Sequence, residues 1–454
     1  KSLNVDLNYK PVCLIETNKK LIGTVIDGLE VYSSQEIRKI IKKFNVKLIL
    51  ISTSEKSNKV KNKLFNYLKT ESIEIKIIPR FKDILNQNLS IRSFKNISYE
   101  QLMNRTKTKS ISSLMTKNIF NKKILVTGAG GSIGSELCRQ IIKQKPQKLL
   151  LVEISEYALY SIHNKLEDFK NIDTEIIPLI GSVQDSQRME SILSIFKPAT
   201  IYHAAAYKHV PLLEENISES IYNNVLGTIV LSECAYKISD KFILISTDKA
   251  VRPTNIMGAT KRVSEMCIQS ISRKAIKDGL NISYSIVRFG NVLGSSGSVI
   301  PLFMKQIKKG GPVTLTHPEV KRYMMTIPEA VLLVLQTSNL AKTGDICLLE
   351  MGEQIKILDI AKRLIKLNGY TIKDDSNPDG DIKIKYIGLR PGEKLYEELS
   401  IDNNFTKTSN PLIFKANDLS YDENSFNHDL KELFESTKEN SKVKIISALQ
   451  KLVV

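Results

Sequence analysis

Apolar residues in this chain gather into short runs, each followed by small or polar residues and then by a helical pattern. The clearest case starts at Ile124–Val126, passes through glycines at 128, 130, 131 and 134, and continues in a segment at 136–143 with apolar positions at 137, 141 and 142. Further apolar runs occur at 149–153, 175–180, 199–206 and 241–249. Strands that alternate with amphipathic helices predict a parallel sheet covered by helices.

The first 85 residues show the same alternation on a smaller scale. We expect strands at 11–15, 46–52 and 73–78, and helices at 34–44 and 56–69. Residues 86–120 form a polar linker in which a short helix can begin near 98–105. The predicted fold is α/β, with two Rossmann-like parallel-sheet domains: an accessory domain at 1–85 and a larger domain at 121–454, extended by a small lobe mainly at 290–400.

The glycine-rich stretch has the context that a phosphate-binding loop requires, because it lies between a strand and a helix. The spacing is Gly128-x-x-Gly131-x-x-Gly134, and Glu153 ends the next strand, where an acid can bind the adenosine ribose hydroxyls. No Arg or Lys directly follows Glu153, so a ribose 2′-phosphate would be repelled and NAD is favoured over NADP. The expected cofactor-binding residues are Gly128, Gly130, Gly131, Ser132, Ile133, Gly134, Glu153, Ser182, Val183, Ala204, Ala205 and Ala206.

Polar residues with possible chemistry follow two of the later strands. The run at 241–249 delivers Thr247, Asp248 and Lys249 at its carboxyl end, where ligands of open α/β sheets lie. Lys208 and His209 come just after the strand at 199–206 and are expected to meet a ligand, whereas His203, inside that strand, is expected to be packed.

Composition and charge exclude several classes of protein. The hydrophobic share of 42% and the charged share of 25% are those of a globular protein. The net charge of +18 comes without a nucleic-acid-binding motif, so anionic nucleotides or a membrane surface explain it better than nucleic acid. The five cysteines lack disulfide or metal-ligand spacing, so no metal site is expected. No apolar run has the length of a membrane span, and because the chain begins at Lys1 we expect a membrane segment to be missing from it.

Several ordered motifs together resemble a known family. They are Gly128-x-Gly-Gly-x-x-Gly134, Ala204–Ala206, Ser246–Ala250, Asn255-x-Met-Gly-Ala-Thr-Lys261, Val287–Pro301 and Arg390–Lys394. Over residues 121–400 the chain resembles the extended short-chain dehydrogenases/reductases, and within them the membrane-anchored nucleotide-sugar 4,6-dehydratases of bacterial polysaccharide biosynthesis that act on UDP-N-acetylglucosamine. The resemblance implies substrate-binding roles for Lys208, His209, Asn291, Ser298, Val299, Thr314, Arg322, Arg390 and Glu393. It also implies a cofactor-binding role for Lys261, at the nicotinamide ribose.

One position departs from the superfamily pattern. The active site of such enzymes contains Tyr-x-x-x-Lys, and here Met257 stands four residues before Lys261. A thioether cannot exchange protons, so another group must take the C4 hydroxyl proton. We expect Asp248 to take it, directly or through Thr247 or a water, with Lys261 as the competing base. Lys249 can remove the C5 proton if burial and cationic surroundings lower its pKa toward neutrality.

The resemblance implies an NAD-dependent lyase that converts UDP-N-acetylglucosamine to its 4-keto-6-deoxy derivative with retention at C5. The expected setting is a homo-oligomer at the cytoplasmic face of the bacterial inner membrane, in glycan or glycoprotein sugar synthesis. Two alternatives remain open. One is a UDP-sugar 4-epimerase or C5-inverting 4,6-dehydratase, and the other is a non-catalytic NAD-sensing scaffold.

Overall fold

The computed structural model describes residues 10–51, 71–78, 95–96, 111–169, 173–400, 405–416 and 421–453. The chain divides into two compact units, each discontinuous in sequence. Unit 1 comprises 1–106, 299–318 and 356–388, and unit 2 comprises 107–298, 319–355 and 389–454.

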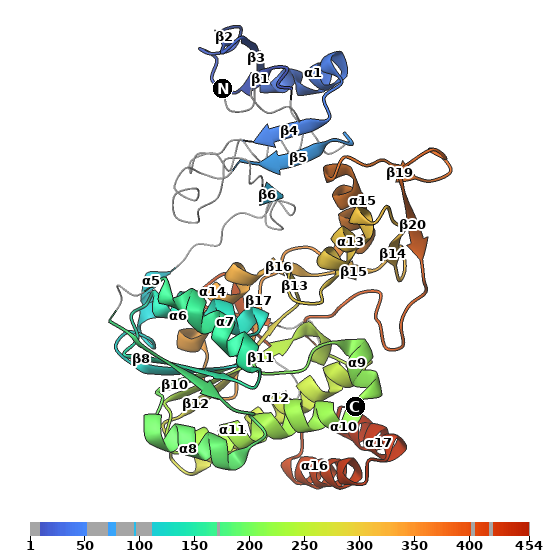
Figure 1. The fold of residues 1–454 in the computed structure, drawn as a ribbon. Helices are drawn as coiled ribbons and strands as arrows, with labels where there is room; N and C mark the ends of the chain where they lie inside the picture. The colour runs from blue at the N-terminus through green and yellow to red at the C-terminus, as the bar shows by residue number, and fades with distance from the viewer. Residues whose placement is uncertain are drawn as a thin grey trace. The chain divides into compact units, whose positions relative to one another are not determined.

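A sheet flanked by helices forms the centre of unit 2 (Figure 1). It has nine strands among the described residues, in the order β21-β22-β17-β12-β11-β10-β7-β8-β9. The neighbours from β9 to β17 are parallel, and β22 and β21 add an antiparallel edge. The order reverses between β7 and β10, which is where ligands bind in open sheets of this type. The strands are β7 (Lys123–Thr127), β8 (Lys148–Glu153), β9 (Glu175–Ile180), β10 (Thr200–His203), β11 (Lys241–Thr247), β12 (Ser283–Phe289), β17 (Ile346–Leu349), β21 (Phe405–Lys407) and β22 (Ile413–Ala416).

Helices cover both faces of this sheet because its strands are apolar on both sides. In β7, Ile124 and Val126 pack into one core cluster with α6 (Ser132–Ile142), α7 (Glu156–Glu167) and α14 (Ile327–Leu340). Leu125 faces the other way, into a second cluster with α8 (Ser186–Phe196), α11 (Gly227–Ala235) and α12 (Ile256–Lys277). A third cluster joins α12 to the terminal helices α16 (Glu423–Lys438) and α17 (Lys442–Val453). The predicted α/β fold with a helix-covered parallel sheet is confirmed.

Shorter elements of unit 2 connect the sheet to the site. They are α5 (Ser112–Thr116), α9 (Val210–Glu215), α10 (Ile217–Ile221), the π-helical η2 (Tyr222–Leu226), η3 (Asp248–Ala250), β13 (Asn291–Leu293), β15 (Lys321–Arg322) and β16 (Met324–Thr326). The two-residue strand β18 (Ile355–Lys356) lies on the boundary, with Ile355 the last residue of the second segment of unit 2 and Lys356 assigned to unit 1.

The N-terminal part of unit 1 has two small sheets, β1-β3-β2 and β4-β5-β6. Each contains one parallel and one antiparallel pair, so the sheets are mixed and not the parallel sheet expected from the sequence. An Asp27-Gly28 turn with positive φ at both residues joins β2 to β3, and this tight turn makes them antiparallel. The elements are β1 (Leu14–Glu16), β2 (Val25–Ile26), β3 (Leu29–Ser33), η1 (Ser34–Glu36), α1 (Ile37–Phe44), β4 (Leu48–Ile51), β5 (Glu74–Ile77) and β6 (Lys95–Asn96).

The helices expected at 56–69 and 98–105 lie outside the described residues. Two later segments complete unit 1, with α13 (Val299–Lys308), β14 (Val313–Leu315), α15 (Ile357–Leu367), β19 (Ile372–Lys373) and β20 (Ile382–Tyr386). Leu367 of α15 packs on a cluster that includes Ile37 and Ile75, so much of the lobe expected at 290–400 groups with the N-terminal residues. Among the described helices, none is both long and apolar enough to cross a membrane.

Candidate active site at the carboxyl end of the sheet

The loop after β7 needs its glycines for steric reasons. Gly128 has a φ of +62°, and a Cβ at Gly134 would lie 2.0 Å from the Gly128 carbonyl oxygen. A Cβ at Gly130 would lie 2.5 Å from the Ala158 Cβ on α7. The loop therefore packs closely on itself at the N-terminus of α6, which is where a diphosphate binds in sheets of this type.

Glu153 and the end of β10 lie beside this loop. The Glu153 carboxylate accepts from the Gly130 N–H at 3.0 Å, and its other oxygen accepts from the N–H groups of Ile154 and Ser155. A Cβ at Gly128 would lie 2.8 Å from the Ala205 Cα, so the small residues after β10 let the two strand ends approach closely. The loop, Glu153 and Ala205 therefore lie together at the carboxyl end of the sheet, next to the point where the strand order reverses. The dinucleotide site expected there stays a prediction.

Other expected cofactor residues lie at the same edge of the sheet. Ser132, at the start of α6, accepts from the Ser296 N–H at 3.2 Å, which ties the loop after β13 to the glycine loop. Ser182 follows β9, and its hydroxyl accepts from the Gln184 N–H. Val183 is buried in the core, where its side chain occupies the space that a Cβ at Gly227 would need.

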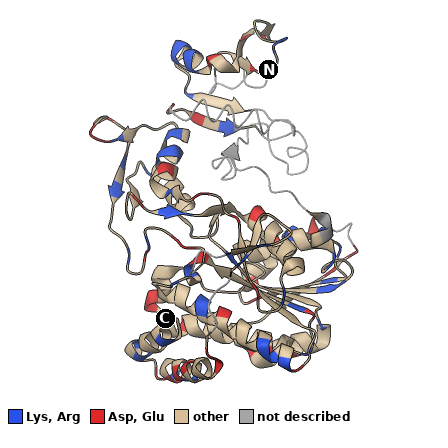
Figure 2. Ribbon diagram, turned by 180° about the vertical axis from the view of Figure 1, so that it is seen from behind, with Lys and Arg blue, Asp and Glu red and all other residues tan. Residues whose placement is uncertain are grey.

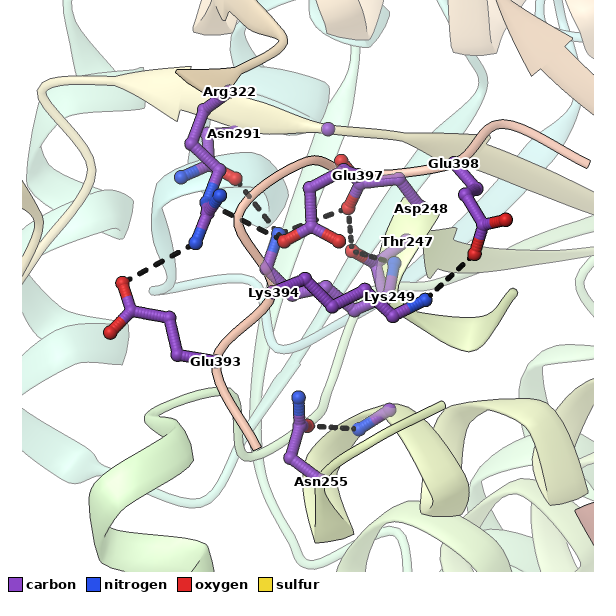
Figure 3. A network of polar contacts seen from close by, with 12 residues as sticks. Thr247, Asp248, Lys249, Asn255, Asn291, Arg322, Glu393, Lys394, Glu397 and Glu398 are labelled. Carbon is purple, nitrogen blue, oxygen red and sulfur yellow. Dashed lines mark hydrogen bonds and ion pairs between the residues drawn. The ribbon is translucent and has the colours of Figure 1, made fainter. Parts of the chain in front are cut away.

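Thr247, Asp248 and Lys249 are joined by hydrogen bonds at the end of β11 (Figure 3). The Thr247 hydroxyl donates to Asp248 Oδ1 at 2.9 Å, and Lys249 Nζ donates to the same oxygen at 3.0 Å. The Asp248 side chain is fully buried, and its Oδ2 has no hydrogen-bond partner among the described residues. Protons can therefore reach Asp248 through the partly exposed Thr247 hydroxyl.

The surroundings of Lys249 are anionic, which corrects the expectation from the sequence. Burial lowers the pKa of Lys249, but the Asp248 and Glu397 carboxylates raise it by more, and the net result is a raised pKa. Arg322 is the cation that opposes them. The prediction that cationic groups surround Lys249 is therefore wrong. Glu397, whose Oε1 lies 3.4 Å from Lys249 Nζ, contributes a negative charge from a segment far away in sequence.

Arg322 connects Glu397 to the expected substrate residues. Its Nε lies 3.5 Å from Glu397 Oε1, and its Nη2 lies 3.3 Å from Glu393 Oε1. Arg390 is exposed, and its backbone N–H donates to Glu393 in a turn that includes Gly392. Asn291, also an expected substrate residue, accepts from Lys249 Nζ at 2.9 Å.

Lys261 and Met257 occupy the first two turns of α12. Lys261 Nζ donates to the Ile245 carbonyl at 2.7 Å, and burial lowers its pKa to about 8 despite the opposing charge of Glu265. Met257 is buried in the cluster that packs α12 on α17. These positions suit Met257 as a spacer and keep Lys261 as the competing base.

The histidines differ in their surroundings. His203 bonds with the hydroxyls of Thr127 and Thr228, and burial lowers its pKa to about 3, so the prediction that it is packed is confirmed. Lys208 and His209 follow β10 and are exposed. A Cβ added at Gly297 would lie 2.3 Å from His209 Cε1, so the loop after β13 passes close to one edge of the ring.

Three expected substrate residues are not joined to this network. The buried Ser298 hydroxyl has no partner among the described residues. Val299 begins α13 in unit 1, and Thr314 of β14 in the same unit is bonded to Gln306 through both its hydroxyl and its N–H.

No metal was expected. His428, Asp429 and Glu432 hold ligand atoms within 4.8 Å of one another on α16, in a mainly polar surface group.

The sequence reasoning missed two buried groups. Glu397 was overlooked because two neighbouring acids, Glu393 and Glu398, gave it no distinguishing context. Asn224 lies in η2, accepts from the Tyr207 N–H and donates to the Thr260 hydroxyl. π-Helical turns frequently lie at functional sites, but the periodicity of the sequence does not reveal this one.

The fold and this strand-end site define a Rossmann-like short-chain dehydrogenase/reductase. The chain belongs to a family of polysaccharide biosynthesis proteins, whose family model matches residues 124–418. The capsular polysaccharide biosynthesis protein CapD of Staphylococcus aureus is 45% identical over 397 residues, which are 87% of this chain and 64% of that protein. The chain thus spans less than two thirds of that relative. A UDP-glucose 4-epimerase of Rickettsia canadensis is 32% identical, over 63% of this chain and 80% of the enzyme.

Solved structures share the fold. Pen from Bacillus thuringiensis matches with a TM-score of 0.59 and 31% identity, over 66% of this chain and 89% of that chain. A double mutant of the dTDP-glucose 4,6-dehydratase DesIV from Streptomyces venezuelae, with NAD bound, matches with a TM-score of 0.52 and 21% identity, over 62% of this chain and 88% of that chain.

Proposed function

We propose that this protein is an NAD-dependent nucleotide-sugar 4,6-dehydratase that converts UDP-N-acetylglucosamine to the 4-keto-6-deoxy sugar with retention at C5. The observation that carries the proposal is the group Thr247, Asp248 and Lys249, which places a hydroxyl relay, a carboxylate and an amine on successive residues at the carboxyl end of β11. Oxidation at C4 followed by elimination across C5–C6 requires a proton acceptor, an acid and a base.

The glycine loop supports NAD as the cofactor. Side chains at Gly128, Gly130 or Gly134 would collide with backbone or with α7, so the close turn from β7 into α6 requires glycine at these positions. Glu153, held by three N–H groups next to the loop, suits the ribose hydroxyls and opposes a 2′-phosphate. When bound, NAD would take the hydride from C4 and return it at C6, so that no net oxidation occurs.

In the oxidation half-reaction the C4 hydroxyl proton moves to Thr247 Oγ as the Thr247 proton moves to Asp248 Oδ1. This route follows the 2.9 Å hydrogen bond and agrees with the complete burial of the Asp248 side chain. Asp248 becomes neutral in this step. One of the two carboxylates that raise the pKa of Lys249 is thereby discharged.

The elimination half-reaction depends on Asp248 having become neutral. With Asp248 neutral, the pKa of Lys249 falls, and its partly exposed side chain can release a proton to solvent. The free amine then takes the C5 proton, while the Asp248 proton returns through Thr247 to the departing C6 hydroxyl, which leaves as water. Lys249 gives a proton back to C5 when hydride reaches C6, and it then takes up a proton from solvent, which restores the starting ammonium beside the ionised Asp248.

The pair of Asp248 and Lys249 favours a dehydratase over a 4-epimerase and over a non-catalytic scaffold. A C5-inverting dehydratase needs the same two groups, and the configuration at C5 of the product distinguishes it. A 4-epimerase, the activity named for the Rickettsia relative, moves only the C4 hydride and the C4 hydroxyl proton. It therefore has no need of a second acid and base. An NAD-sensing scaffold needs neither. Incubation with UDP-N-acetylglucosamine and NAD is expected to yield the 4-keto-6-deoxy sugar by NMR. Recovery of only a C4 or C5 epimer, or of unchanged substrate with bound NAD, would reject the dehydratase.

We also propose that the protein works at the cytoplasmic face of the bacterial inner membrane. Lys and Arg outnumber Asp and Glu two to one in unit 1, whereas the two kinds of charge nearly balance in unit 2. Figure 2 shows basic residues along both α15 and β20, and exposed lysines include 362, 383 and 385. Flotation with phosphatidylglycerol vesicles but not with phosphatidylcholine vesicles is expected, and equal flotation with both would contradict a charge-based attachment.

A further inference from the structure

The Lys249 ammonium group is surrounded by three acceptors from three separate segments (Figure 3). Lys249 Nζ lies 3.0 Å from Asp248 Oδ1, 2.9 Å from Asn291 Oδ1 and 3.4 Å from Glu397 Oε1. An ammonium has three N–H donors and no acceptor, so the set of partners fits the charged form. A neutral amine would leave one acceptor facing a lone pair.

Asp248 has a role in the proposed reaction, but Glu397 has none so far. Its side chain is only 4% exposed, and burial of an ionised carboxylate is costly unless cations compensate. Lys249 and Arg322 are those cations. Lys249, the expected base, is therefore paired with the Glu397 carboxylate, which keeps its charge throughout the proposed reaction.

The segment that carries Glu397 is fixed to the loop after β11. The Thr254 hydroxyl donates to the Gly392 carbonyl at 2.8 Å, and Lys394 Nζ donates to the Val251 carbonyl at 3.1 Å. Gln354 donates to the carbonyl of Glu397 itself at 2.8 Å. These contacts hold the backbone of Glu397 in place relative to Lys249, so the carboxylate position does not depend on the two ion pairs alone.

We propose that Glu397 is a positioning residue that holds the Lys249 amine at the site and determines the pH at which it becomes a free base. This inference rests on the proposed function and extends it. While Asp248 and Glu397 are both anionic, the charged form of Lys249 is held strongly. Once Asp248 is neutral, Glu397 is the carboxylate that remains beside the amine, and Arg322 is the cation that opposes it.

Glu397 then has two opposing effects on elimination. It reduces the fraction of Lys249 that is free base at neutral pH, because a nearby carboxylate favours the ammonium. It also stabilises the positive charge that forms on Lys249 when the C5 proton arrives. Removing its charge should therefore move the pH dependence toward lower pH and reduce the rate that is reached at high pH.

The test is the pH profile of deuterium uptake at C5 from heavy water, with UDP-N-acetylglucosamine and NAD. In Glu397→Gln the midpoint of the rising limb is expected to move down by about one to three pH units, the range for loss of an opposite charge at this distance. Glu398→Gln is the matched control. Among the described residues Glu398 forms its ion pairs with Arg252 and Lys394 and not with Lys249, so the midpoint of Glu398→Gln is expected to match the wild type.

The outcomes separate this inference from the proposed function. Absence of C5 exchange in the wild-type protein would reject the proposed function. Exchange in the wild type with the same midpoint in Glu397→Gln would overturn the role of Glu397 and leave the function standing. If the Gln variant does not fold, Glu397→Asp, which keeps the charge but withdraws it by one methylene, is expected to shift the midpoint less and in the same direction. An unmoved midpoint in that variant also overturns the inference.

Discussion

Replacing Asp248 by Asn tests which group accepts the C4 proton. Asn keeps the size of the side chain and an oxygen that can accept from Thr247 and Lys249, whose donors lie 2.9 and 3.0 Å from Oδ1. It removes the ability to take a proton. A positioned general base contributes about 10²–10⁴-fold in rate, or about 3–5 kcal/mol of barrier at about 1.4 kcal/mol per factor of ten.

The same substitution has a structural cost that must be measured separately. The Asn amide would take the place of Asp248 Oδ2, for which no partner exists among the described residues. A buried donor without an acceptor costs about 1–3 kcal/mol of stability. Thermal unfolding of Asp248→Asn should therefore be recorded beside its kinetics, and kinetics should be measured well below the unfolding temperature.

Single-turnover absorbance at 340 nm measures the oxidation step directly, because the reduced cofactor absorbs there. We expect the folded Asp248→Asn protein to form this signal at least about 10²-fold more slowly than the wild type. Rapid accumulation of the signal followed by a stall would refute the reasoning. Asp248 would then be only the acid of the elimination, and Lys261, whose pKa is about 8, would be the leading candidate for the base.

Three further substitutions test the other roles. Lys249→Ala should stop deuterium uptake at C5 from heavy water, and undiminished uptake measured by NMR would reject Lys249 as the base. Thr247→Val lacks the hydroxyl that bonds to Asp248 and should slow the 340 nm signal by about 10²-fold or more, while Thr247→Ser should retain most of the rate; equal rates for Val and Ser would show that the proton bypasses this residue. Met257→Leu keeps a buried apolar side chain and should lower kcat by less than about tenfold, or 1.4 kcal/mol, and a larger loss would give the thioether a role in the chemistry.

The parts of the fold that were predictable are those with strong local periodicity. The strand, glycine loop and helix at 123–142 and the polar residues that end β11 follow from patterns within about 20 residues. The antiparallel edge of β21 and β22 did not, because those strands are only three and four residues long. The mixed N-terminal sheets depend on a two-residue turn whose importance shows only once β2 and β3 are paired.

The same limit applies to the site. Thr247, Asp248 and Lys249 were identifiable because they are consecutive at a strand end. The sign of the pKa shift of Lys249 was not, since it depends on Glu397, which stands 148 residues later in the chain and reaches Lys249 only in the folded protein. Charges that act on a buried amine come from the tertiary structure, and sequence spacing does not report them.

The most direct test of the central claim is the fate of the hydrogen at C4. UDP-N-acetylglucosamine carrying deuterium at C4 should be incubated with the protein and NAD, and the product examined by NMR and mass spectrometry. A 4,6-dehydratase moves that hydride within one molecule, so we predict a 4-keto sugar whose C6 methyl group carries the deuterium. Deuterium that remains at C4, in recovered substrate or in a 4-epimer, would contradict the proposed function.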